Sequence, residues 1–295
     1  MLAIVVAHLV AGVFVHTYWL YTGDTSFFRY YFGYQGSLVL IGFSALEVVF
    51  AYLAYREFCA GQPLGASWLC ILIAGACHFC GSILVHLLST PSAINPLVYL
   101  LPAWNEDFAN LMLHSGRAVG GPVQMAFLLW GLFLSLRFYR RMGMLAKLQP
   151  MDKLLACATL GYAALVIGGI IIGVRSQPGP VQYSQILTWP NDYLLSILLL
   201  EAIFLRRSAL EMGWGYTSKV WGAFTVAIFL TSLCSLLNWL TAYGVLDWRG
   251  TAFVWYLWYP ASAAFAIAPA YQWEATHTAQ VRLMADTESL QLTTA

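Results

Sequence analysis

Long apolar stretches recur along the chain and are separated by short polar connections. Eight of them have about the 20 residues that an α-helix needs to cross the hydrocarbon core of a bilayer. They predict helices over residues 2–20, 33–54, 66–89, 121–138, 154–174, 187–205, 219–240 and 251–272. Lipid offers no hydrogen-bond partners to the backbone, so a spanning segment must satisfy its own N–H and C=O groups as a helix. The pattern therefore predicts an all-α fold, a polytopic transmembrane helical bundle of about eight spans.

The composition excludes a soluble domain. Hydrophobic residues make up 60% of the chain and charged residues only 9%, against about a quarter charged in soluble proteins. The net charge is +1 and no basic stripe is present, so no nucleic-acid partner is expected. The first span opens without a basic segment before it, which favours an uncleaved helix over a signal peptide. The expected surroundings are the lipid bilayer of a cell membrane.

Positive side chains predict the orientation of the spans. One side of the predicted membrane carries most of the arginines and lysines, whereas the other side carries only Arg29, Arg117, Arg175 and Arg249. The first group comprises Arg56, Arg137, Arg140, Arg141, Lys147, Lys153, Arg206, Arg207, Lys219 and Arg282. Cytoplasmic loops carry an excess of Lys and Arg. We therefore expect a multi-pass protein with both termini in the cytoplasm.

The ends of the second and sixth spans resemble each other. LEVVFAYLAYRE runs from Leu46 to Glu57, and LEAIFLRRSALE runs from Leu200 to Glu211. The same offset superposes Cys80 on Cys234 and the first span on the fifth. This predicts two four-helix halves, residues 1–150 and 151–275, followed by a short cytoplasmic tail over 276–295. An even number of spans per half makes the two repeats parallel.

Two carboxylates lie inside the predicted spans at equivalent positions of the two halves, Glu47 and Glu201. Ionised carboxylates are expensive in a membrane and often mark proton or ion pathways. They are therefore candidates for a proton relay. The alternative is an ion pair with a snorkelling arginine of a neighbouring helix, such as Arg206 or Arg207. Their shallow depth favours the ion pair.

Three histidines are candidates for a ligand or haem site: His16, His86 and His114. His16 and His86 are expected near the outer face on two helices that run in the same direction. Neutral imidazole is a good axial ligand of haem iron, so a b-type haem between these two is geometrically possible. Hydrogen bonds to neighbouring helices are the more common role of histidines in spans.

The cysteines and the sequence motifs indicate no disulfide framework, metal site or catalytic site. The six cysteines lie in or near apolar spans, which argues against a disulfide framework. The string CHFC, Cys77 to Cys80, lacks the four-ligand set of a closed metal site, so no metal is expected. No nucleotide loop, serine elbow or HExxH spacing is present. An enzyme is therefore not the favoured class.

The outer side is expected to be rich in aromatic residues and to carry one structured loop. The aromatic clusters lie around residues 18–34 and 248–259 and favour an interfacial belt over an aromatic-walled pocket. In the loop over 90–120, Asn105 predicts the cap of a short helix. Such a helix favours a position flat on the membrane over a lid. Any ligand site is expected on this outer side.

Two classes of function follow, with a third and weaker one. The favoured class is a membrane sensor, or a subunit or scaffold of a larger assembly, which would need other membrane subunits or a separate signalling partner. Its support is the scarcity of polar residues in the middles of the spans. The alternative is a proton-coupled secondary transporter that uses Glu47 and Glu201, favoured by the repeat and by broken helices. The weaker alternative is a membrane haem protein.

Overall fold

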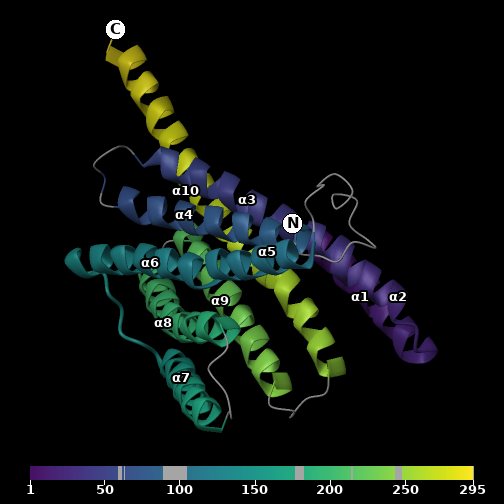
Figure 1. The fold of residues 1–295 in the computed structure, drawn as a ribbon. Coiled ribbons are helices and arrows are strands. Elements are labelled where there is room, and N and C mark those ends of the chain that lie inside the picture. Colours follow the sequence, from purple (N-terminus) through teal and green to yellow (C-terminus); the bar gives the residue numbers. More distant parts are fainter. Residues whose placement is uncertain are drawn as a thin grey trace.

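The computed structural model describes residues 1–58, 62, 64–88, 105–176, 183–213, 215–242 and 248–294. Over these residues the chain is helical and contains no strand (Figure 1). Six helical segments within them are long and apolar enough to cross a membrane: Leu2–Thr22, Thr25–Glu57, Gly65–Leu88, Asp107–Arg141, Pro150–Gly169 and Gly215–Thr241. The prediction of an all-helical membrane protein is therefore confirmed, with six candidate spans where the sequence predicts eight.

The helices follow the predicted ranges closely and are longer at several ends. In chain order they are α1 (Leu2–Thr22), α2 (Thr25–Phe28), α3 (Gly36–Glu57), α4 (Gly65–Ser82), α5 (Glu106–Ala118), α6 (Gln124–Arg141), α7 (Pro150–Ser176), α8 (Tyr183–Glu211), α9 (Gly215–Ala242) and α10 (Trp248–Thr294). Three π-helical segments connect some of them: η1 (Arg29–Gln35), η2 (Ile83–Leu88) and η4 (Val119–Val123). The segments predicted over 187–205 and 251–272 lie in α8 and α10.

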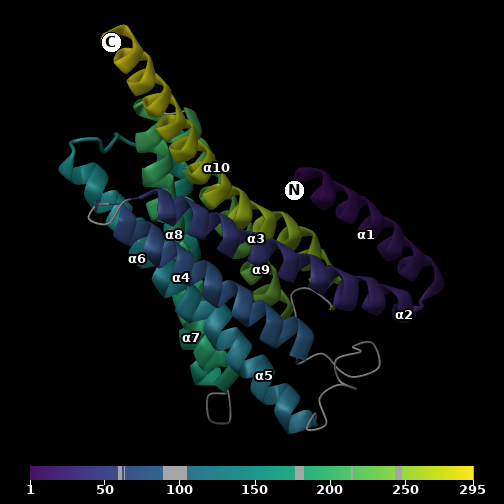
Figure 2. The same cartoon turned by 90° about the horizontal axis from the view of Figure 1, so that it is seen from above.

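Six helices pack in a closed order. Each contacts the next in the sequence α3, α4, α6, α8, α9, α10, and α10 returns to α3. Helix α1 lies outside this ring against α10 and η1, and α7 lies outside it against α8. Figures 1 and 2 show α1 and α7 at opposite margins of the bundle.

One apolar core fills the ring and joins both predicted halves. It contains residues from all six ring helices, and its largest members are fully buried. Trp68 of α4, Tyr139 of α6 and Trp221 of α9 are among them, and the indole N–H of Trp221 donates to the Tyr139 hydroxyl at 3.1 Å. Because such amphipathic rings find a partner when they are buried, this bond fixes α6 against α9 across the core.

The helix predicted after Asn105 is present, and Asn105 caps it. Its Oδ1 accepts from the backbone N–H of Phe108 at 2.7 Å. The helix is not a separate element, however. It continues through η4 into α6, with non-helical backbone angles only at Gly121, and it packs against α4 and η2. The structure therefore replaces the expected flat helix or lid by the first part of a broken transmembrane helix (Figure 2).

Glycines allow that broken helix to approach α4 closely. A Cβ placed on Gly81 of α4 would lie 2.5 Å from the Cα of Gly120, and a Cβ on Gly116 would lie 3.0 Å from the Gly81 carbonyl oxygen. Small residues drive helix association where lipid is as apolar as leucine. In α7, Gly169 likewise lies against the ring of Trp239.

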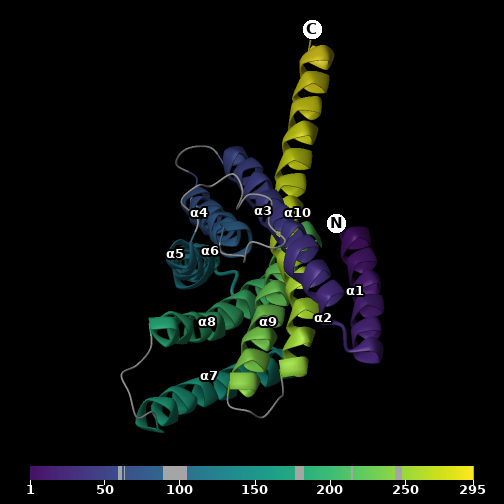
Figure 3. The same ribbon diagram turned by 45° about the vertical axis from the view of Figure 1, so that its right-hand side comes forward.

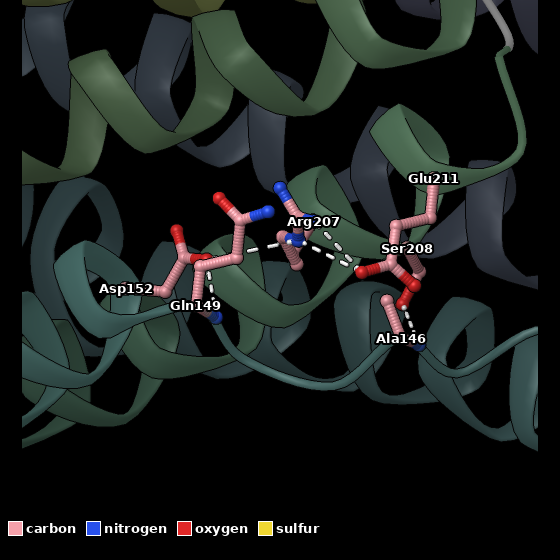
Figure 4. A network of polar contacts seen from close by, with 6 residues as sticks. All are labelled: Ala146, Gln149, Asp152, Arg207, Ser208 and Glu211. Atoms are coloured by element: carbon pink, nitrogen blue, oxygen red, sulfur yellow. Dashed lines mark hydrogen bonds and ion pairs between the residues drawn. The ribbon is translucent and has the colours of Figure 1, made fainter.

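The connection between α6 and α7 is held against the end of α8 (Figure 4). The backbone N–H of Ala146 donates to the Ser208 hydroxyl at 3.2 Å. Arg207 forms a salt bridge with Glu211 at 2.7 Å and lies 3.8 Å from a carboxylate oxygen of Asp152. The basic connections after the fourth and sixth predicted spans therefore lie together at one end of the bundle.

Helix α10 continues well beyond its predicted span. It runs without interruption to Thr294, so the predicted tail over 276–295 is the projecting end of this helix (Figure 3). Two contacts join it to the same end of the bundle. The Tyr216 hydroxyl donates to Glu274 at 3.2 Å, and His277 lies 3.9 Å from Glu57.

Candidate intramembrane carboxylate sites

The first candidate site joins α3 and α4 through Glu47 and His78. The Glu47 side chain is buried, and its Oε2 lies 2.6 Å from Nδ1 of His78. Gly75 lies beside it, since a Cβ there would be in van der Waals contact with Cγ of Glu47, at 3.4 Å. The edge of the His78 ring meets Phe265 of α10. The pair thus lies between α3 and α4 with its imidazole against α10, and Glu47 has one polar partner among the described residues.

The Glu47–His78 pair can hold its proton on either partner. Carboxylate with imidazolium and carboxylic acid with neutral imidazole have the same net charge of zero, and both keep the hydrogen bond. A neutral pair avoids the large cost of an isolated charge in lipid. The sequence favours an arginine as the partner of Glu47, and the structure places a titratable histidine there.

Glu201, the second predicted carboxylate, lies in α8, and its surroundings differ from those of Glu47. Its Oε2 is buried and has no hydrogen-bond partner among the described residues. The arginine predicted as a partner, Arg207, bonds to Glu211 instead. Arg206 extends past Gly222 of α9. The two glutamates are therefore not equivalent in chemistry, since one has an imidazole and the other has an unsatisfied oxygen.

Asp192 is a third buried carboxylate that sequence reasoning missed. It lies in α8 and accepts hydrogen bonds from the Ser235 hydroxyl and, at 2.5 Å, from the indole N–H of Trp239, both in α9. The signal was present, because Asn191 and Asp192 interrupt an apolar segment after Pro190.

The histidines predicted as a ligand set lie apart. His16 of α1 lies 3.2 Å from the Tyr256 hydroxyl of α10, and His86 of η2 lies 3.3 Å from the Ser37 hydroxyl of α3. His114 lies half-buried on α5. Figures 2 and 3 show α3 and α10 between α1 and α4, the helix that continues into η2. His16 thus has its hydrogen-bond partner on α10, and His86 has one on α3 and ring contacts with Trp255 and Trp258 of α10.

The aromatic residues predicted for the outer side divide into a packed cluster and a set of exposed side chains. Tyr31, Phe32 and Tyr259 are buried and pack with Val15 and Leu40, whereas Tyr18, Tyr21, Phe27 and Tyr30 remain exposed. A second histidine belongs to this cluster. The Tyr31 hydroxyl donates to the His8 carbonyl at 3.0 Å and lies 2.9 Å from its Nδ1. These bonds fix α1 to η1.

One open groove lies beside this aromatic cluster, with a volume of about 370 Å³. Val13, His16, Thr17 and Leu20 of α1 and Tyr256 of α10 line it. Of the three histidines predicted for a ligand site, His16 lines this groove, and His86 and His114 are not among its lining residues. Val13, Thr17 and Leu20 among its lining side chains are exposed.

No metal centre is apparent in the described part of the chain, where no three His, Cys, Asp or Glu side chains gather. Cys70, Cys77, Cys80, Cys157 and Cys234 are free thiols. His78, from the CHFC string, is the partner of Glu47.

No family model, curated protein or solved structure matches this chain. The fold and the composition therefore define the class by themselves. An all-helical chain with several helices of membrane-spanning length and apolarity is an integral membrane protein.

Proposed function

We propose that this protein is a proton-coupled secondary transporter of a cell membrane, with eight spans in two related halves and both termini in the cytoplasm. The observation that supports it best is the buried Glu47 together with Glu201, whose Oε2 atom is buried. One is bonded to a titratable imidazole, and the other has a carboxylate oxygen without a partner. Intramembrane carboxylates of this kind serve proton pathways.

The order of contacts among the ring helices supports the two halves. If α3, α4 and α6 correspond to α8, α9 and α10, the contacts of α3 with α4 and of α4 with α6 repeat as those of α8 with α9 and of α9 with α10. The contact of α10 with α3 then corresponds to that of α6 with α8. A twofold axis along the membrane normal would relate the ring helices in this order. The first helices of the two halves differ, because α7 packs on α8 whereas α1 packs on α10.

The two glutamates would then alternate in their proton load. A proton on Glu201 removes the cost of an unpaired charge in lipid, and its release requires access to water or a partner. The Glu47–His78 pair holds a proton at no net charge. A transporter that exposes each site in turn to opposite sides would load and unload these protons with its substrate.

Proton flux into proteoliposomes tests this proposal. The protein is reconstituted with a pH-sensitive dye inside the vesicles, and an inward proton gradient is applied while candidate solutes are screened. We expect solute-dependent acidification that Glu201→Gln abolishes. Glu211→Gln, an exposed glutamate of the same helix, is the matched control. Equal solute-dependent flux in both variants would remove Glu201 from the mechanism.

A membrane sensor, or a subunit or scaffold module, is the second candidate. The observation that favours it is the apolar core that runs through both halves, which holds the ring helices together. A rigid module needs such a core, whereas a carrier needs its halves to move. Co-purification with a stable partner under mild detergent, together with no solute-dependent flux, would favour this candidate.

A further inference from the structure

A basic surface runs along one end of the bundle, from the last turns of α6 to the first turn of α7. We define it by five exposed side chains, Arg137, Arg140, Arg141, Lys147 and Lys153. Among the described residues, Arg207 is the one arginine or lysine that forms a salt bridge. The charges of the basic surface therefore have no carboxylate partner in this part of the structure.

The carboxylates near the basic surface are already engaged. Asp152 is the only acidic residue in the sequence between positions 124 and 183. It accepts from the backbone N–H of Gln149 at 3.0 Å and lies 3.8 Å from Arg207, which is also paired with Glu211 (Figure 4). The anions that balance the basic surface must therefore come from outside the chain.

The basic surface lies at the boundary of the membrane, because it joins two candidate spans. One of them ends at Arg141 and the next begins at Pro150, so that residues 142–149 alone connect them. The headgroup region on either side of the hydrocarbon core is about 5–8 Å deep. A connection this short keeps its side chains close to that region, and the charges are therefore presented at the level of lipid headgroups.

Exposed apolar side chains alternate with the charges. In the connection and at the start of α7 they are Met142, Leu145, Met151 and Leu154. On α6, Trp130 and Phe133 are exposed on the face that carries Arg137, and their rings lie 5.4 Å apart. Large apolar side chains next to cations are typical of a surface that lies between headgroups and acyl chains.

The connection that carries Lys147 is held in a defined conformation. Its Ala146 N–H donates to the Ser208 hydroxyl of α8 at 3.2 Å, and its Met144 N–H donates to the Tyr139 carbonyl at 2.9 Å. A ligand of this segment therefore has little backbone to order when it binds, which lowers the entropic cost of binding.

We propose that the basic surface binds the headgroup phosphates of anionic phospholipids, with phosphatidylglycerol as the representative chemistry. The charges are complementary, because anionic headgroups attract basic segments next to a membrane span. Arginine presents a planar fork of N–H donors that matches phosphate oxygens. An acidic protein would match the charges as well, but it would not account for the apolar side chains between them. This inference goes beyond the proposed function and does not depend on transport.

Thermal unfolding of the purified protein in a non-ionic detergent tests this surface. The protein is titrated with short-chain phosphatidylglycerol, with phosphatidylcholine of the same chain length, and with free glycerophosphate. A ligand that binds only the folded state raises Tm with its concentration. We expect a saturable rise of Tm with phosphatidylglycerol and a clearly smaller effect of the other two. The rise should shrink at about 0.5 M NaCl, because salt screens exposed charges.

Two variants locate the site. The first replaces the three arginines of α6 and combines Arg137→Gln, Arg140→Gln and Arg141→Gln. The second combines Lys147→Gln with Lys153→Gln and carries the test if the first does not fold. We expect each variant to raise the concentration of phosphatidylglycerol at half-maximal effect by at least about tenfold.

Arg117→Gln is the control. It changes an exposed arginine of α5, which belongs to the same broken helix as α6 but lies outside the basic surface. This variant should respond to phosphatidylglycerol as the unmodified protein does.

Each contrary result overturns the proposal. An equal rise of Tm with phosphatidylcholine shows that the headgroup charge is not recognised. An equal rise with glycerophosphate indicates a site for free anions, and an equal rise with added poly-glutamate indicates an acidic protein partner. Undiminished phosphatidylglycerol binding by both variants places the lipid elsewhere. The flux test of Glu201 stays separate, because it uses a different variant and these titrations need no transport.

Discussion

Glu47 and His78 approach within 2.6 Å across the interface of α3 and α4, and the Glu47 side chain of this pair is almost fully buried. Removal of one partner from a buried ion pair is costly because the other is left unpaired, whereas removal of both is often nearly neutral. The pair therefore has a testable energetic signature, which separates a bonded pair from two independent side chains.

We expect His78→Phe to lower the free energy of unfolding by about 3 kcal/mol. The double variant, which combines Glu47→Leu with His78→Phe, should lower it by clearly less. The difference is measured as a double-mutant cycle of unfolding in detergent or nanodiscs. His277→Phe is the control, because His277 is exposed and its contact with Glu57 is long, at 3.9 Å. Additive effects of the two changes would contradict a direct bond.

Glu201→Gln is expected to have little effect on stability. Its Oε2 has no hydrogen-bond partner in the described structure. Replacement of the carboxylate by an amide of the same shape therefore breaks no hydrogen bond at this atom. We expect a change in the free energy of unfolding of no more than about 0.5 kcal/mol, as at sites away from specific interactions. Chemical or thermal unfolding measures it. A loss of several kcal/mol would show that Glu201 is ionised and paired.

The contact of Gly81 with Gly120 predicts a severe effect of a single methyl group. Gly81→Ala places a Cβ 2.5 Å from backbone atoms that cannot rotate away. We expect it to destabilise the protein by about 1–3 kcal/mol through overpacking. Gly42→Ala and Gly161→Ala are matched controls in helices α3 and α7, where a Cβ meets nothing within 4 Å. Equal melting temperatures for the three variants would mean that α4 and η4 do not approach closely.

Topology is tested by reporter fusions at Ala146 and Pro180. Ala146 lies in the basic connection that is held to Ser208, and Pro180 lies outside the described residues, in the next predicted connection. The positive-inside rule places Ala146 in the cytoplasm and Pro180 outside. Alkaline phosphatase should therefore be active only at Pro180. Activity on the same side at both positions would contradict the number or the direction of the spans.

The helices could be predicted because their signals are local. Runs of about 20 apolar residues define a span without knowledge of its neighbours. The cap by Asn105 is local as well, because its Oδ1 accepts a hydrogen bond from the N–H of Phe108, three residues further along. The continuity of α5 with α6 was not predicted, because glycine and proline at Gly121 and Pro122 usually end a helix. Packing against α4 keeps this one continuous.

The chemistry of the candidate sites could be predicted only in part. Glu47 and Glu201 stand out because a carboxylate in an apolar run is rare. Their partners depend on which helices meet, and the sequence gives no direct information on that. His78 was therefore considered with its neighbouring cysteines, and the bond to α3 was missed. Asp192 was missed because its hydrogen-bond partners, Ser235 and Trp239, lie on another helix.

Proton movement in proteoliposomes that carry the Glu201→Gln variant tests the central claim most directly. The unmodified protein and Glu211→Gln should acidify the vesicle interior when a transported solute is present, and Glu201→Gln, reconstituted to the same density, should not. Acidification by the Glu201→Gln variant at the rate of the unmodified protein would contradict a role of this carboxylate in proton coupling.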